Sequence, residues 1–127
     1  MMNILITYDD QAEMGYIYMT EKHTDPVTTE DIGETALMAD LDRDNRIIGI
    51  EFSGDAAPDI ARLGTIAGKK QKLEPAFLNG ERVYSFRPNR LEAAKTILMN
   101  RVGFHFADTG CQHFIGFDVF DRKEKSE

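Results

Sequence analysis

The chain has 127 residues, of which 42% are hydrophobic and 29% charged, a balance typical of one folded domain and unlike that of a disordered chain. Its 22 acidic and 15 basic side chains give a formal net charge of -7, which argues against general binding to nucleic acids or anionic membranes.

The only cysteine, Cys111, cannot form an internal disulfide, which fits a reducing compartment. The sequence has no signal-peptide pattern and no apolar run of the length that crosses a membrane. We therefore expect a cytoplasmic protein.

The first segment predicts a β-hairpin. Apolar and polar residues alternate over residues 3–19, and the polar residues 9–13 have the length of a hairpin loop. The polar residues 20–34 then predict a connecting loop in which residues 28–30 form a short extended piece.

The clearest predicted element is the hairpin that follows. Its alternating apolar residues share one face if a two-residue turn lies at residues 44–45. This register sets Leu37 opposite Phe52 and Leu41 opposite Ile48.

Two helices are predicted. Asp55 is suited to cap a helix over residues 56–67, whose apolar residues recur at helical spacing. Asn89 with Glu92 three residues later resembles a capping box, which predicts a second helix that ends at about Met99.

Two further hairpins are predicted. Asn79-Gly80 lies between two apolar runs and is the strongest short signal for a hairpin turn. A last hairpin pairs residues 102–106 with residues 113–119 around a turn at Thr109-Gly110.

Two stretches of the sequence look alike. Residues 38–40 and 48–52 read Met-Ala-Asp and Ile-Gly-Ile-Glu-Phe, and about 67 residues later, residues 106–108 and 115–119 read Phe-Ala-Asp and Ile-Gly-Phe-Asp-Val. An internal duplication explains this likeness, and so does chance similarity between hairpins.

These elements predict an α+β fold. We expect an antiparallel sheet of roughly six to eight strands, built from hairpins, with two helices packed on one face. Residues 1–127 form a single domain in this interpretation, with halves at residues 1–68 and 73–122.

One acidic stretch resembles the twelve-residue calcium loop of an EF-hand, although Asn45 replaces the glycine at position 6. The candidate ligands are Asp40, Asp42, Asp44 and Glu51. Period-two alternation enters and leaves this stretch, whereas an EF-hand needs flanking helices. A solvated hairpin turn is therefore the favoured interpretation.

Residue types that bind zinc gather near the C-terminus, namely His105, Asp108, Cys111 and His113. The predicted register sends His105 and His113 to opposite faces of the hairpin, which argues against a shared metal. We expect no metal and no cofactor.

Two functions remain open, because the sequence contains no phosphate-binding glycine loop, nucleophile elbow or C-x-x-C motif. The first is a non-catalytic module that binds another protein or itself through a strand edge or an aromatic face with Tyr16 and Tyr18. The second is a small ligand-binding protein or enzyme, with carboxylates and His105 or His113 in a cleft between the halves.

The N-terminal half, about residues 3–54, resembles a short prokaryotic domain of unknown function, DUF2283. The matching motifs are Ile6-Thr7-Tyr8-Asp9, Ala12, Tyr16-Ile17, Asp40-Leu41-Asp42-Arg43-Asp44 and Ile48-Gly49-Ile50-Glu51. Glu13 and Asn45 stand where the family often has aspartate and glycine. The resemblance implies a small, mostly antiparallel β domain without an established activity, and an antitoxin-like binder, since some relatives lie beside toxin-like genes.

Overall fold

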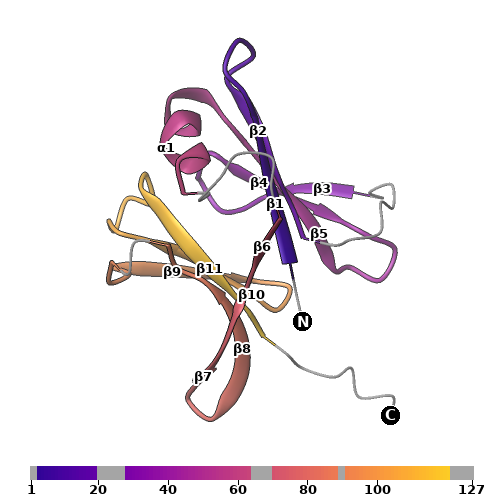
Figure 1. The fold of residues 1–127 in the computed structure, drawn as a ribbon, viewed down its shortest axis with the longest axis vertical. Coiled ribbons are helices and arrows are strands. Elements are labelled where there is room, and N and C mark those ends of the chain that lie inside the picture. The colour runs from indigo at the N-terminus through magenta and orange to yellow at the C-terminus, as the bar shows by residue number, and fades with distance from the viewer. Residues whose placement is uncertain (1–2, 20–27, 64–69, 89–90, 121–127) are drawn as a thin grey trace.

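A computed structural model describes residues 3–19, 28–63, 70–88 and 91–120 of the chain. It contains two antiparallel sheets and one short helical segment (Figure 1). Strands make up 57% of the described residues and helix only 8 residues, so the expected α+β class is wrong and the protein is mostly β.

The first sheet, here called the N-sheet, has six strands in the order β3-β4-β5-β2-β1-β6. Its strands are β1 (Asn3–Asp9), β2 (Met14–Tyr18), β3 (Thr28–Asp31), β4 (Leu37–Leu41), β5 (Ile47–Ser53) and β6 (Lys70–Lys72). The predicted first hairpin and the extended piece in the following loop are confirmed as β1–β2 and β3.

The second sheet, here called the C-sheet, has five strands in the order β7-β8-β11-β10-β9. Its strands are β7 (Glu74–Leu78), β8 (Glu81–Phe86), β9 (Lys95–Met99), β10 (Val102–Phe106) and β11 (Phe114–Phe120). The hairpin predicted from Asn79-Gly80 is confirmed, and both turn residues have positive φ, 52° and 83°.

The predicted register of the β4–β5 hairpin is confirmed at one end and wrong at the other. Leu37 pairs with Phe52, as expected, but Leu41 pairs with Ile47 because a bulge follows Asp40. Ile48 is the extra residue, and the longer turn that results places Asn45 at a φ of 60°.

The single helical segment consists of η1 (Gly54–Ala56) and α1 (Ala57–Ala61), which is shorter than the predicted helix over residues 56–67. Residues 64–67 of that prediction lie outside the described residues. Among the residues that the structure describes, no helix is long and apolar enough to cross a membrane.

The second predicted helix is wrong, because its last five residues form β9. The proposed cap at Asn89 lies outside the described part of the chain. In β9, Ile97 pairs with a core residue of β10, while Leu91 and Leu98 of the proposed apolar stripe are exposed. Pairing with β10 therefore overrides the helical spacing of these residues.

The two sheets share one hydrophobic core, so each sheet covers the apolar face of the other where helices were expected. Side chains from both sheets and from α1 are fully or almost fully buried in this core, among them Ile17, Ile50, Phe52, Ala57, Ile60, Phe104, Phe106 and Phe117. The chain crosses from one sheet to the other between β6 and β7 (Figure 1).

The C-sheet repeats the strand order of the N-sheet. The order β9-β10-β11-β8-β7 corresponds to β3-β4-β5-β2-β1, strand for strand along the chain. Both central hairpins also contain a bulge at the same step, after Asp40 opposite Gly49 and after His105 opposite Gly116. His105, rather than Asp108 as the sequence likeness suggested, therefore stands where Asp40 stands.

Gly116 provides a test of this register. Its φ is +151°, and a Cβ at this position would lie 2.0 Å from the Phe86 carbonyl oxygen. We expect Gly116→Ala to lower the free energy of unfolding by roughly 2–4 kcal/mol in a urea titration. Gly103→Ala on the neighbouring strand would meet only side-chain atoms at 3.3 Å. Gly103→Ala should lower the free energy of unfolding by less than about 1 kcal/mol. Equal losses in the two variants would contradict the register.

Candidate functional site

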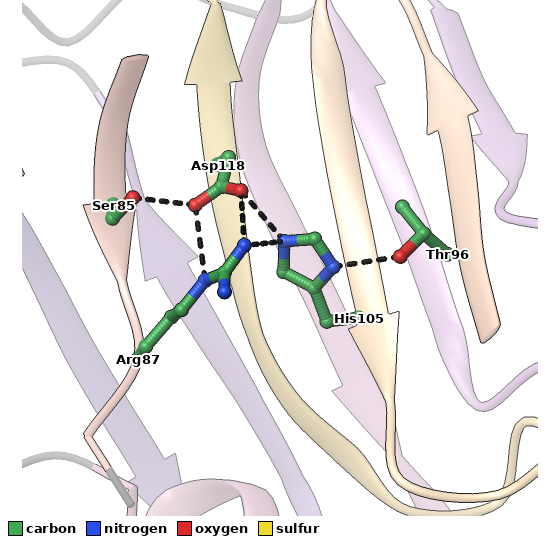
Figure 2. Close-up of polar contacts among 5 residues, drawn as sticks. All are labelled: Ser85, Arg87, Thr96, His105 and Asp118. Atoms are coloured by element: carbon green, nitrogen blue, oxygen red, sulfur yellow. Dashed lines mark hydrogen bonds and ion pairs between the residues drawn. The ribbon is translucent and has the colours of Figure 1, made fainter. Parts of the chain in front are cut away.

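A polar cluster lies on the outer face of the C-sheet (Figure 2). The cluster consists of Ser85 on β8, Arg87 directly after it, Thr96 on β9, His105 on β10 and Asp118 on β11. Their strand neighbours, among them Phe86, Phe104 and Phe117, point into the shared core. Since side chains alternate along a strand, the five polar residues face outward.

Asp118 is the centre of this cluster, and only 1% of its surface is exposed. Ser85 Oγ donates to Oδ1 over 2.6 Å, and Arg87 Nη2 donates to Oδ2 over 2.6 Å. His105 Nε2 lies 2.9 Å from Oδ2. Burial raises the pKa of Asp118, but the hydrogen bonds from His105, Arg87 and Ser85 outweigh it and hold the pKa well below its usual range. Asp118 is therefore ionised.

Both ring nitrogens of His105 have partners within the protein. An ionised Asp118 can only accept, so Nε2 carries a proton and donates to it. Nδ1 lies 2.8 Å from the Thr96 hydroxyl, which donates to the neutral ring and accepts from the charged ring. The imidazole therefore has no nitrogen left for a substrate.

Arg87 reaches solvent, with 45% of its side chain exposed, as does Thr96 at the other side of the cluster. The Nε and Nη2 of Arg87 donate to the two oxygens of Asp118, at 3.4 and 2.6 Å. Nη2 also lies 3.1 Å from His105 Nε2, and Nη1 has no partner among the described residues (Figure 2). The guanidinium is therefore held through Nε and Nη2 and open at Nη1.

Arg87 and Asp118 line a hollow of about 460 Å³ on this outer face. Apolar walls surround the polar cluster, and they include Leu78, Ala93, Leu98 and Phe120. Glu81 and Asn79 also line the hollow. A second hollow of about 490 Å³, over β7 and β8, shares Arg87 and Asp118 with the first.

A second cluster occupies the corresponding place on the N-sheet. Tyr16 and Thr29 donate to the two oxygens of Asp40 over 2.8 and 2.7 Å. The hydrogen bond with Asp40, burial and the charge of Asp40 together raise the pKa of Glu51 to about 7. The two carboxyl groups therefore share a proton near neutral pH.

The predicted aromatic face exists in part. The rings of Tyr16 and Tyr18 meet edge-on with centroids 4.5 Å apart, and Tyr18 is 38% exposed. Tyr16, however, is bound to Asp40, and its ring lies over Gly49, where a Cβ would overlap it. Burial and the bond to Asp40 also raise the pKa of Tyr16.

The four candidate calcium ligands are split between two places. Asp40 and Glu51 are joined on the outer face of the N-sheet. Asp42 instead accepts the backbone N–H groups of Asp44 and Arg46, at 2.8 and 2.9 Å, and Asp44 forms an ion pair with Arg46. These bonds build the hairpin turn. Within the described ranges, no three His, Cys, Asp or Glu side chains are placed to hold a metal ion.

The candidate zinc ligands are also apart. His113 is exposed, and its backbone N–H donates to Asp108 over 2.9 Å. That bond, against the smaller effect of burial, lowers the pKa of Asp108. His105 is instead bound to Thr96 on the C-sheet. The carboxylate of Asp108 therefore caps a loop rather than joining the two histidines.

Four residues of the C-sheet cluster were missed by sequence analysis, namely Ser85, Arg87, Thr96 and Asp118. The signal for Asp118 was a charged residue between Phe117 and Val119 in an apolar strand, at the position that matches Glu51 in the sequence likeness. Arg87 carried no such signal, because it follows β8 in a stretch that reads as solvated.

Comparison with known proteins supports the resemblance of the N-terminal half. The sequence pattern of a family described as a protein of unknown function, DUF2283, matches residues 5–54. The "Uncharacterized protein YuzE" of Bacillus subtilis (strain 168) is 32% identical over 117 residues, covering 90% of this chain and 85% of that protein. The chain belongs to the same family as YuzE, and its N-terminal part, residues 5–54, is a DUF2283 region. No solved structure matches it.

The family match spans β1–β5 and thus the Asp40 cluster of the N-sheet. The match to YuzE is longer than this region by 67 residues and so reaches into the C-sheet (117 against 50 residues).

The Asp40–Glu51 pair predicts a pH-dependent stability. Glu51 has a raised pKa in the folded state, about 7 against 4.5, so the folded protein binds more protons between these values. Its contribution, about 1–3 kcal/mol, is present below pH 4.5 and lost as the pH rises to 7. Glu51→Gln keeps a neutral hydrogen-bonding group.

Urea unfolding at several pH values tests this expectation. Glu51→Gln should remove most of the fall in unfolding free energy between pH 4.5 and 7, whereas Glu30→Gln at an exposed position of β3 should retain it. The same dependence of the unfolding free energy on pH in both variants would contradict a proton shared by Asp40 and Glu51.

Asp118→Ala tests the C-sheet cluster. The change leaves the buried His105 and the guanidinium of Arg87 without their carboxylate, and we expect a loss of about 3–5 kcal/mol in unfolding free energy. The matched control is Asp59→Ala, which removes an exposed ion pair with Arg62 on α1. It should cost less than about 1 kcal/mol, and similar costs for the two variants would contradict the role of Asp118.

Proposed function

We propose that this protein is a non-catalytic binding protein whose ligand enters the hollow on the outer face of the C-sheet. The observation that carries the proposal is Arg87, whose guanidinium is fixed by a buried carboxylate and still half exposed in an apolar-walled hollow. Binding sites for small molecules combine such apolar walls with a few fixed polar groups. A volume of about 460 Å³ lies in their usual range.

Binding is favoured over catalysis because the reactive groups are occupied. Ser85 donates to Asp118 and not to His105, and the lowered pKa of Asp118 makes this carboxylate a weak base for activating the hydroxyl. Both nitrogens of His105 are used. On the N-sheet, both oxygens of Asp40 accept hydrogen bonds.

The proposal differs from the expected cleft between the two halves. The space between the sheets is filled by the buried side chains of both, from Ile50 on the N-sheet to Phe104 on the C-sheet. The hollow lies instead on an outer face.

A titration with a small-molecule library, followed by amide NMR spectra, tests the proposal. We expect ligands that shift the amides of Leu98, Gly103 and Phe120 together. Leu98→Asn should weaken the binding of these ligands, because the Leu98 side chain is 70% exposed and lines the hollow. Leu91→Asn, an exposed leucine away from the hollow, is the control. Shifts that appear only elsewhere would contradict the proposal.

Self-association is the second candidate function. Phe77 is 74% exposed on β7, an edge strand of the C-sheet, and Leu98 is exposed on the opposite edge strand, β9. Glu74 on β7 and Lys95 on β9 give the two edges opposite charges, so a second copy would pair edge to edge and cover both apolar side chains.

Light scattering on size-exclusion fractions tests this candidate. A dimer or larger species that Phe77→Glu converts to a monomer would support self-association. A monomer at all concentrations would contradict it and leave the ligand-binding proposal unaffected.

We also propose a cytoplasmic location, which the unpaired and buried Cys111 supports.

A further inference from the structure

We infer that the hollow of the C-sheet binds a small molecule with one carboxylate group on an apolar body, with the carboxylate held by Arg87. The inference rests on the proposed function and names the chemistry of its ligand.

The guanidinium of Arg87 has one nitrogen that is open to a ligand. Nε and Nη2 donate to Asp118, and Nη2 also lies 3.1 Å from His105 Nε2. Nη1 has no acceptor among the described residues. A carboxylate oxygen can accept a charge-assisted hydrogen bond from the N–H groups of Nη1.

The position of Arg87 is fixed before any ligand arrives. Asp118 is buried and ionised, and it binds the guanidinium through both of its oxygens. Binding therefore costs little of the rotamer entropy that a free arginine would lose.

The charges around the hollow favour a single carboxylate over a phosphate. Arg87 is the only cationic side chain among the described residues that line it, apart from the titratable His105, and Asp118 already neutralises one positive charge. This one guanidinium, already paired with Asp118, can balance a single negative charge better than two, so a monoanion is favoured over a dianion.

The walls favour an apolar body next to that carboxylate. Leu78, Leu98 and Phe120 line the same hollow as Arg87, and the two leucines are exposed. A ligand whose apolar body covers these side chains removes apolar surface from water, which stabilises the complex, while its carboxylate binds the guanidinium.

The test uses two probes of nearly the same shape, phenylacetate and the neutral phenylacetamide, with inorganic phosphate as a third. Amide NMR titrations give their dissociation constants. We expect phenylacetate to bind at least about tenfold more tightly than the amide, because its carboxylate accepts a charge-assisted hydrogen bond from Nη1. Phosphate should bind more weakly than phenylacetate.

Two variants assign the effect to Arg87. Arg87→Gln should make the affinities for phenylacetate and phenylacetamide equal, and it should leave the affinity for the amide nearly unchanged. Arg87→Lys keeps the charge beside Asp118 but lacks the planar fork, so it should reduce the difference several-fold. Because Arg87→Gln leaves Asp118 with one cationic partner fewer, thermal unfolding of both variants shows whether the fold persists. If only Arg87→Lys folds, its reduced preference decides the test.

The outcomes separate the two proposals. If both probes bind in the hollow with equal affinity, the binding function stands and the inference of a carboxylate ligand is overturned. If neither these probes nor any library compound binds there, both are overturned. Phosphate that binds as tightly as phenylacetate would overturn the choice of a carboxylate.

Discussion

The buried carboxylate of Asp118 is the interaction on which the outer face of the C-sheet depends. A charge removed from water in this way is costly unless ionic partners and hydrogen bonds compensate it. Ser85, Arg87 and His105 supply these partners from the adjacent strand β8, the residue that follows it, and the adjacent strand β10. The same bonds that stabilise Asp118 therefore fix the guanidinium in the hollow and occupy the histidine that would otherwise be available for catalysis.

The two sheets share a strand order and a bulged central hairpin, but they carry different polar residues at the corresponding positions. Asp40 and Glu51 on the N-sheet correspond to His105 and Asp118 on the C-sheet, because both hairpins have the same register and bulge. Two carboxyl groups must share a proton, whereas a histidine and a carboxylate form a stable pair. The folded N-sheet consequently favours mildly acidic pH, and the lowered pKa of Asp118 makes the C-sheet lose stability only as the pH falls below the usual range of an aspartate.

Local signals predicted the hairpins well, because turn residues such as Asn79-Gly80 and alternating apolar residues act within a few positions of the chain. The bulge after Asp40 and the strand β9 were not predictable in this way, since both depend on pairing with distant residues. Among the site residues, His105 was a candidate from its residue type alone. Asp118 and Arg87 acquire their roles only when β8, β10 and β11 lie side by side.

The ionisation state of Asp118 is the most direct test of this account. A carbon-13 NMR titration of its side-chain carboxyl group, over the pH range in which the protein stays folded, measures its pKa. The account predicts that the signal remains that of a carboxylate at and below the ordinary value of 3.8. A titration midpoint at or above that value would show that Asp118 is not held ionised by its partners, and would contradict a preformed site at Arg87.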